Sequence, residues 1–248
     1  MISIITVCYN AKTDLSKTMD SIAKQVGNIQ VEVIVIDGGS TDGSQYMLEQ
    51  KYRHIVSKFI SEKDKGIYDA MNKGIKQAHN EWIYFLNAGD VFANTDAVSN
   101  ISQLIENGGE YNFIHAPYIS DGVTHTSAEL SLQYLSAHMI NHQSILYRKE
   151  LFDEELYDTS YRFCADYAHL LNSWAKIKAV KANFVIANFD STGISSSEHN
   201  KKRMWEERIR AVWSSSLPVS SKIVLSKRAA IAYPYHYLKG LISSNEKR

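Results

Sequence analysis

The chain has 248 residues, of which 44% are hydrophobic and 22% charged, as expected for a globular protein with a sizeable core. Its net charge is zero, but residues 201–248 hold 11 Lys and Arg against 3 Asp and Glu, whereas residues 1–200 hold 16 against 24. No apolar run is long enough for a membrane span, no basic leader precedes the first strand, and the two cysteines lack metal-site spacing, so we expect a cytoplasmic protein with reduced thiols. We do not expect nucleic-acid binding, because the excess of basic charge lies in the tail while the edge of the predicted pocket is acidic.

The first 90 residues alternate between strand and helix patterns. Strands are predicted at 2–7, 31–36, 55–60 and 82–86, and helices from about 13, at 42–51 and from 67 to 78, where Ile67, Met71, Ile75 and Ala78 form the inward face. The run at 82–86 is apolar throughout and too short for a helix, so it predicts a strand buried on both faces. This alternation is typical of an α/β fold with a parallel, doubly wound sheet.

The pattern is looser after Asp90. We expect helices at 96–107, from 165 and at 195–213, strands at 112–114, 145–147 and 183–189, and a last helical region after Pro218. No linker divides the chain, so one domain with a C-terminal extension is the simplest organisation.

Polar residues follow the predicted strands at their C-terminal ends, which share one edge of a parallel sheet and form the usual ligand site of such folds. Tyr9 could stack on a base, and Asp37 could accept hydrogen bonds from a base or ribose. Lys65 could meet a phosphate, and Asp90 could hold a divalent cation between phosphates. Each side chain alone also fits a plain structural role, such as a turn cap for Asp90, and their coincidence at one edge favours a ligand site.

Common nucleotide-binding and hydrolase motifs are absent from the sequence. The turn at 37–44 contains glycines but matches neither the dinucleotide fingerprint nor the P-loop, and no nucleophile elbow is present.

Four segments, at 3–10, 33–43, 64–74 and 85–90, resemble in order and spacing the signature segments of the GT-A-fold glycosyltransferases of family 2. The resemblance covers residues 1–95 well and later only 142–143 and 165–167. It is closest to bacterial enzymes that build O-antigen, capsule or exopolysaccharide repeat units. It implies a Rossmann-like, open, mostly parallel twisted sheet with helices on both faces, plus a C-terminal helical extension.

The resemblance also implies a donor site. Val7 and Tyr9 would line the uracil pocket of a UDP-sugar, Asp37 would bind the uridine, and Lys65 lies near the position of a basic residue that contacts the nucleotide. Two asparagines in the matched segments complete the nucleotide-sugar set, Asn72 and Asn87.

The implied reaction groups lie at the ends of two further segments. Asp90 matches the last carboxylate of the family's D-x-D-like motif, which binds Mn²⁺ or Mg²⁺ through the diphosphate. Asp166 falls where the family places its general base. His142 and Gln143 would contact the donor sugar or the acceptor, although a packed structural role for His142 is equally compatible with the sequence.

Two departures from the family pattern concern the donor. Gly38 stands where the family's turn often has a second Asp, which leaves the nucleoside contact of Asp37 open. The segment 87–90 carries a single carboxylate, so Asp90 is expected to be the only direct protein ligand of the cation, with weak metal affinity in the absence of the nucleotide.

The resemblance thus implies an inverting hexosyltransferase. It would move a hexose or N-acetylhexosamine from a UDP-sugar to a hydroxyl of a free or undecaprenyl-diphosphate-linked saccharide, in surface polysaccharide (O-antigen, lipopolysaccharide) biosynthesis. Residues 1–95 would form the nucleotide-sugar half, 96–215 the acceptor half and 216–248 the extension. A nucleotidyltransferase and a non-catalytic sugar-nucleotide-binding protein are the alternatives.

The extension mixes basic, aromatic and aliphatic residues over 218–243. This composition suits a helix lying on the inner face of the bacterial cytoplasmic membrane. A helix packed on the domain or in a homodimer interface is the alternative.

Overall fold

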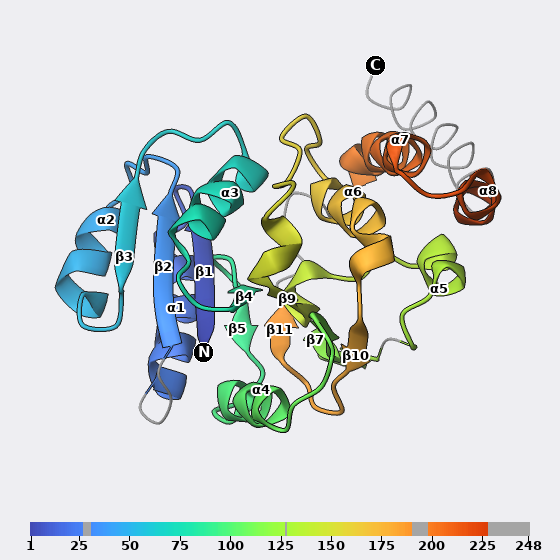
Figure 1. The fold of residues 1–248 in the computed structure, drawn as a ribbon. Helices are drawn as coiled ribbons and strands as arrows, with labels where there is room; N and C mark the ends of the chain where they lie inside the picture. The colour runs from blue at the N-terminus through green and yellow to red at the C-terminus, as the bar shows by residue number, and fades with distance from the viewer. Residues whose placement is uncertain (27–30, 127, 190–197, 228–248) are drawn as a thin grey trace, which may run out of the picture.

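The computed structural model describes residues 1–26, 31–126, 128–189 and 198–227, and it confirms the GT-A architecture that the resemblance implies (Figure 1). Seven strands form the main sheet, in the order β10 (Ala179–Lys181), β6 (Phe113–His115), β9 (Ile145–Arg148), β4 (Trp82–Phe85), β1 (Ile2–Cys8), β2 (Val31–Asp37) and β3 (Lys58–Ser61). Strand β9 is antiparallel to both of its neighbours, and the other pairs are parallel. The sheet is therefore mostly parallel, as expected.

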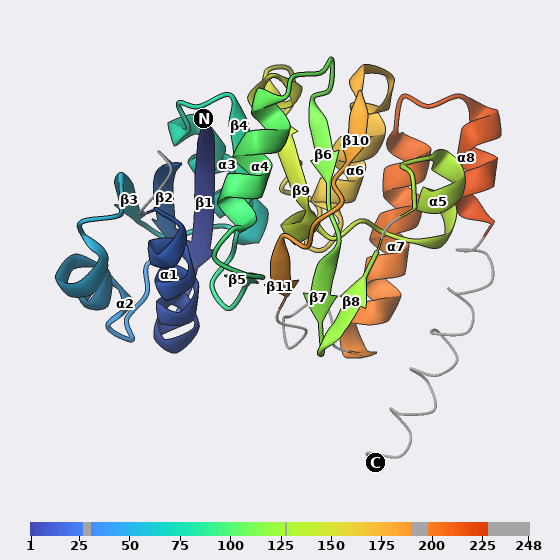
Figure 2. The ribbon, with the colours of Figure 1, turned by 90° about the horizontal axis from the view of Figure 1, so that it is seen from below.

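Helices cover both faces of this sheet (Figures 1 and 2). The helices of the first half are α1 (Lys12–Val26), α2 (Ser44–Met47), the π-helical turn Leu48–Tyr52 and α3 (Ile67–Gln77). Strand β4 is buried between them, since Ile83 and Phe85 join the hydrophobic cluster that contains Met71 of α3, while Tyr84 joins the cluster that contains Met19 of α1. The expected burial of this strand on both faces is confirmed.

Close packing of α3 on β1 depends on Gly74. A Cβ atom there would lie 2.4 Å from Cγ2 of Ile5, which is closer than any real contact. Glycine therefore lets the helix that follows the segment 64–66 approach the central strand, and this approach brings the segment to the carboxyl edge of the sheet.

Two expectations in this half are wrong in detail. The third strand begins at Lys58 rather than at residue 55, because the N–H groups of Ile55 and Val56 donate to the carbonyl of Tyr52 in a turn. Ile67 is 43% exposed, since it is the first residue of α3, and the neighbouring Tyr68 is buried in its place.

The second half contains a smaller sheet that the sequence patterns did not predict. Its strands, in spatial order, are β5 (Val91–Phe92), β11 (Ala187–Phe189), β7 (Tyr118–Ser120) and β8 (Val123–His125). Strand β10 and helix α5 (Leu132–Ala137) were also not predicted. The predicted strand at 183–189 is reduced to β11. Strands of two or three residues are too short to show an alternating pattern.

The remaining helices are α4 (Ala97–Glu106), α6 (Ala165–Asn172), α7 (Glu198–Ser214) and α8 (Val219–Ser226). Predicted inward residues Trp174 and Ile177 lie just after α6 and are partly buried against the core. Leu225 of α8 joins the same core cluster, so the extension begins packed on the domain. The predicted start of α7 at 195–197, and the helical region beyond 227, lie outside the described residues. No helix of the described ranges is long and apolar enough to cross a membrane.

Candidate active site

The loops after β1, β2 and β4 lie together at the carboxyl edge of the main sheet. Cys8 and Asp37 are paired at the ends of β1 and β2, and the N–H of Gly38 donates to the carbonyl of Cys8 at 2.9 Å. The N–H of Ala88 donates to the carbonyl of Val7 at 3.1 Å, which brings the loop that carries Asp90 beside the end of β1. The expected gathering of these strand ends at one edge is confirmed.

Tyr9, Gly38 and Asp64 form a small surface at this edge. A Cβ atom on Gly38 would lie 3.0 Å from Oδ2 of Asp64 and 3.2 Å from Cδ2 of Tyr9, so both side chains pack against the bare glycine. The ring of Tyr9 is 66% exposed and offers a flat face. The carboxylate of Asp64 lies where a side chain at position 38 would begin. This contact explains why position 38 is a glycine here, where the family turn often has an Asp.

Asp64 is a candidate binding residue that the sequence analysis did not single out. Burial raises the pKa of its carboxyl group, and the ammonium group of Lys73, with which it forms an ion pair, acts in the opposite direction. Lys73 also contacts Glu62 at 2.9 Å. The sequence feature that could have identified Asp64 is its position in the segment 64–74, which resembles the family and in which Asp64 immediately precedes Lys65.

Asp37 is fully buried and accepts several hydrogen bonds. Its Oδ2 receives bonds from the Ser40 N–H at 3.0 Å, the Ser61 hydroxyl at 2.6 Å and the Gln45 amide at 3.3 Å, and its Oδ1 receives one from the Ser40 hydroxyl. Asp37 therefore orders the turn that follows β2, and its contact with a uridine stays a prediction.

Three further predicted donor residues have different surroundings. Lys65 is exposed, and its N–H donates to Oδ2 of Asp69 at 3.0 Å. Val7 is buried at the end of β1. The amide of Asn72 donates to the carbonyl of Tyr157 at 2.8 Å and accepts from its N–H at 2.9 Å, so it ties α3 to the loop before α6, and its sugar-nucleotide contact stays a prediction.

The short 3₁₀ turn His142–Ser144 joins the two halves of the site. Nδ2 of Asn87 lies 2.8 Å from Nε2 of His142, and Nδ1 of that ring lies 3.5 Å from Oδ2 of Asp166. The next residue, Gln143, donates from Nε2 to Oδ2 of Asp90 at 2.8 Å. Consecutive residues of one turn therefore contact the two carboxylates that the sequence analysis selected for cation binding and base catalysis.

Asp166 lies in the first turn of α6, where the helix dipole favours a carboxylate. Its Oδ1 accepts from the N–H of Tyr167 at 2.8 Å and lies 3.1 Å from the hydroxyl of Tyr68. Glu207 of α7 accepts hydrogen bonds from the N–H groups of Arg162 and Phe163 at 2.8 to 3.0 Å, which fixes the chain that leads into α6. The carboxylate is thus held in place, with its side chain 12% exposed.

The oxygen atoms around Asp90 fit a hard cation in kind. Oδ1 of Asn87 and Oε1 of Gln143 are buried and have no hydrogen-bond partner among the described residues. Carboxylate and amide oxygens are the ligands that Mg²⁺ and Mn²⁺ accept, together with substrate phosphates. Within the described ranges no group of three or more His, Cys, Asp and Glu residues could hold a metal ion, and the role of Asp90 as a metal ligand stays a prediction.

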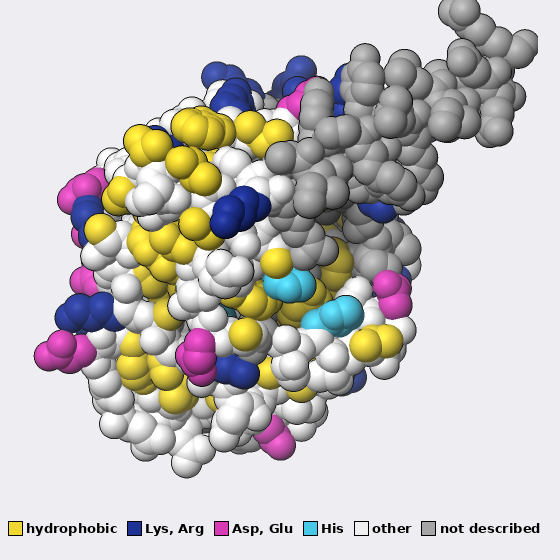
Figure 3. Space-filling view, turned by 90° about the vertical axis from the view of Figure 1, so that its right-hand side faces the viewer, with side chains coloured by type: hydrophobic (Ala, Val, Ile, Leu, Met, Phe, Trp, Pro, Cys, Tyr) yellow, Lys and Arg dark blue, Asp and Glu magenta, His cyan; other side chains and the backbone are white. Residues whose placement is uncertain are grey.

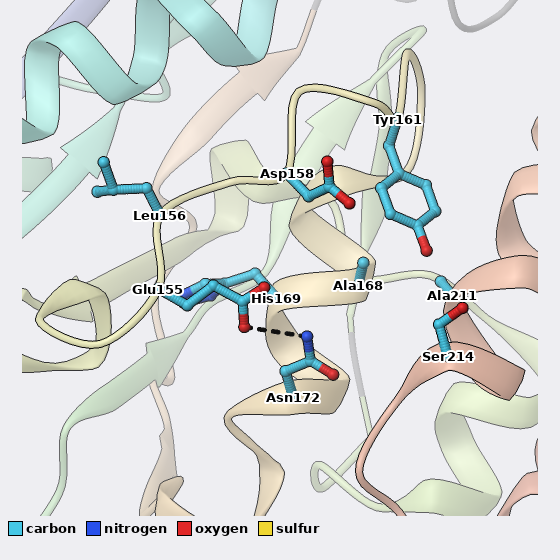
Figure 4. Close-up of a pocket in the computed structure, with 9 residues that line it drawn as sticks. All are labelled: Glu155, Leu156, Asp158, Tyr161, Ala168, His169, Asn172, Ala211 and Ser214. Carbon is cyan, nitrogen blue, oxygen red and sulfur yellow. Dashed lines mark hydrogen bonds between the residues drawn. The ribbon is translucent and has the colours of Figure 1, made fainter.

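A separate cavity of about 200 Å³ lies between α6, the end of α7 and the loop before α6 (Figure 4). His169 lines it and donates from Nε2 to the carbonyl of Leu151 at 3.0 Å, and burial lowers the pKa of this imidazole to about 4. Glu155 accepts from the amide of Asn172 at 3.0 Å across the cavity. Neither Asp90 nor Asp166 lines this cavity, so it is distinct from the candidate active site.

Comparison with known families now adds to the geometry. The family model for glycosyl transferase family 2 matches residues 3–168. The chain belongs to this family. The match spans β1 to the first half of α6, so it includes both carboxylates of the site, and it shows that the protein is a transferase enzyme.

Curated relatives are glycosyltransferases at low identity. An uncharacterized glycosyltransferase of Mycobacterium tuberculosis is 27% identical over 206 residues, which cover 79% of this chain and 77% of the relative. A PGL/p-HBAD biosynthesis glycosyltransferase of Mycobacterium bovis is 28% identical over 200 residues, which cover 78% of each chain.

Solved structures confirm the fold. TarS 1–349 of Staphylococcus aureus, in complex with UDP-GlcNAc, aligns with a TM-score of 0.70 at 15% identity over 96% of this chain and 72% of that chain. The mannosyltransferase PcManGT of Pyrobaculum calidifontis, in complex with GDP-Man and Mn²⁺, aligns with a TM-score of 0.72 at 14% identity over 97% of this chain and 73% of that chain.

Proposed function

We propose that this family 2 glycosyltransferase is an inverting hexosyltransferase that moves a hexose or N-acetylhexosamine from a UDP-sugar to a saccharide hydroxyl. The observation that carries the proposal is the turn His142–Ser144. Through Gln143 it contacts Asp90, and through His142 it contacts Asp166. In this proposal one turn contacts both the cation-binding carboxylate and the base, as a single displacement between donor and acceptor requires.

The donor would lie at the carboxyl edge, with its base on the exposed ring of Tyr9 and beside Asp64. Lys65 would approach the phosphates, and Asn87 would lie near the sugar. The structure of TarS with UDP-GlcNAc supports uridine as the nucleoside, and that of PcManGT with Mn²⁺ supports a divalent cation in this fold.

The chemistry divides between the two carboxylates. A divalent cation held by Asp90 would stabilise the negative charge on the departing diphosphate. Asp166 would take the proton from the attacking hydroxyl, which approaches the anomeric carbon from the face opposite the diphosphate, so the configuration inverts. His142 would position Asp166 through the contact between its Nδ1 and Oδ2 of the carboxylate.

We expect UDP to bind more tightly in the presence of Mn²⁺, and Tyr9→Ala to weaken UDP binding by about tenfold, because stacking on an aromatic ring contributes roughly 1–3 kcal/mol per base. Isothermal titration calorimetry with UDP and GDP measures both effects. Tyr46→Ala is the matched control, since Tyr46 on α2 is 67% exposed and similar in exposure to Tyr9.

Turnover is then followed as UDP release from UDP-hexoses over a panel of saccharide acceptors. Absence of UDP binding would contradict the proposed donor, and binding without turnover would favour a sugar-nucleotide-binding protein.

We further propose that the acceptor is carried by a lipid at the inner face of the membrane, in the synthesis of a surface polysaccharide. Support comes from exposed apolar side chains at the junction of α7 and α8, which are Trp213 (51%), Val219 (64%) and Ile223 (52%). Lys222 lies beside them and donates to the carbonyl of Trp213 at 3.1 Å. Apolar side chains flanked by lysine suit an anionic membrane surface.

Vesicle sedimentation tests this surface. The protein is expected to bind vesicles with anionic phospholipid more tightly than neutral ones, and the double change Val219→Ser with Ile223→Ser is expected to reduce binding by about tenfold, since each buried CH₂ contributes about 0.8 kcal/mol. Val123→Ser is the control, because Val123 is 57% exposed on β8. An alternative result is that the protein binds no vesicles and forms a dimer, measured by light scattering, that the double change dissociates. That result would show that the surface is a homodimer interface.

A further inference from the structure

Two pairs of a tyrosine stacked on a histidine lie in the second half of the domain, outside the contacts described above. Tyr118 of β7 stacks on His125 of β8, with ring centroids 5.0 Å apart and planes at 14°. Tyr134 of α5 stacks on His138, with centroids 4.9 Å apart and planes at 26°. Both histidines are exposed and both tyrosines are partly buried. These four residues are called the aromatic platform below.

The fold holds both pairs in position. Tyr118 and His125 are direct partners in the β7–β8 ladder, and Tyr134 and His138 are four residues apart at the end of α5. Leu135 of α5 is fully buried, and its carbonyl accepts a hydrogen bond from Arg208 of α7. Because Leu135 points into the core, the neighbouring Tyr134 is only partly buried.

The two pairs lie near enough for Tyr118 to act electrostatically on Tyr134. Burial raises the pKa of the Tyr134 phenol, and the neighbouring Tyr118 raises that pKa further. Figure 3 shows histidine side chains beside hydrophobic ones at a hollow on the face that carries α5. The platform therefore combines flat apolar ring faces with phenol and imidazole groups that can form hydrogen bonds.

The platform is also continuous with the candidate active site. The N–H of Ala116, two residues before Tyr118, donates to the carbonyl of Ser144 at 2.8 Å. Burial raises the pKa of the Tyr118 phenol, and a hydrogen bond with the Asn141 side chain acts in the opposite direction. Asn141 caps the turn His142–Ser144, since its carbonyl accepts from the Ser144 N–H at 2.9 Å. The next residue is His142, which contacts Asp166. Two consecutive residues, Asn141 and His142, thus link Tyr118 of the platform to the candidate base.

We propose that the aromatic platform binds a sugar ring of the saccharide acceptor whose hydroxyl attacks the donor. This inference rests on the proposed function and names the acceptor subsite of the same site. A pyranose presents an apolar C–H face and a rim of hydroxyls, so it matches ring faces edged by phenol and imidazole groups. In the proposed function the nucleotide base stacks on the exposed ring of Tyr9, which follows β1 in the first half of the domain. The donor therefore does not need the platform.

Proton NMR tests binding directly. In the presence of UDP and the diamagnetic cation Mg²⁺, methyl α- and β-hexopyranosides are added, and the imidazole signals are assigned with the changes His125→Gln and His138→Gln. The signals of His125 and His138 are expected to shift, whereas that of His54, which is exposed in the nucleotide-binding half, stays in place. If no glycoside of the panel shifts the platform signals while UDP binds, the inference is overturned.

Transfer kinetics provide the second measurement. The double change His125→Ala with His138→Ala affects exposed residues and is expected to raise the acceptor KM by about tenfold, with kcat and the donor KM changed less than about twofold. Tyr134→Phe keeps the ring and should change the acceptor KM little, whereas Tyr134→Ala should raise it. An acceptor KM unchanged by the double histidine change would overturn the inference, whatever the tyrosine variants do.

Two comparisons separate the remaining explanations. Transfer rates to methyl glycosides, compared with those to the same sugars on an alkyl diphosphate, distinguish a free from a lipid-linked acceptor. The platform contacts the sugar itself, so its histidine signals should shift with both compounds. If UDP does not bind, the proposed function itself is contradicted. If UDP binds and UDP-sugars are hydrolysed normally, but no glycoside shifts the histidine signals of the platform, only the acceptor subsite is contradicted.

Discussion

Asp166→Asn is expected to reduce kcat by roughly 10²–10⁴-fold, the usual contribution of a positioned general base. Asparagine has nearly the same shape and can still accept from the N–H of Tyr167, but it cannot take a proton from the acceptor hydroxyl. The affinity for UDP should stay unchanged, because the proposed role of Asp166 concerns the acceptor hydroxyl. Steady-state kinetics with the best acceptor, together with calorimetry for UDP, measure the two effects separately.

Tyr68→Phe is the matched comparison for this change. The hydroxyl of Tyr68 lies 3.1 Å from Oδ1 of Asp166 and donates to the carbonyl of Phe163 at 2.9 Å, so its removal alters the surroundings of the carboxylate but leaves the base in place. Its activity should fall far less than that of Asp166→Asn. Full activity of Asp166→Asn with the true acceptor would show that another group is the base.

Asp90→Asn is expected to reduce kcat/KM by roughly 10²–10³-fold, because the charge on the leaving diphosphate loses its fixed cation. The amide oxygens of Asn87 and Gln143 are neutral, so they do not replace the negative charge of Asp90. The effect of Mn²⁺ on UDP affinity, measured by calorimetry, should largely disappear in this variant.

Asp96→Asn is the control for a general loss of negative charge. Asp96 is exposed at the start of α4, a few residues after Asp90, and should change neither the Mn²⁺ effect nor the kinetics. If Asp90→Asn keeps the Mn²⁺ dependence of UDP binding, the cation is held elsewhere in the protein.

The sequence analysis located the residues at the ends of strands, but not the contacts between distant segments of the site. Tyr9 directly follows β1, Asp37 is the last residue of β2, and Asp90 lies in the loop after β4. The positions of strand ends follow from the apolar runs before them. Asp64 was missed because its importance comes from packing against Gly38, which no pattern along the chain shows. The contact of His142 with both Asn87 and Asp166 joins residues far apart in the chain.

The sequence alone determined the alternating strands and helices of the first half, their parallel sheet and the edge at which the candidate donor residues gather. Those features follow from local apolar patterns and from the rule that parallel strands share one carboxyl edge. Only the tertiary structure decided the second sheet, helix α5 and the aromatic platform, since Tyr118 and Tyr134 belong to elements too short for a periodic signal. Such elements owe their conformation to contacts with distant residues, as α5 does to Arg208.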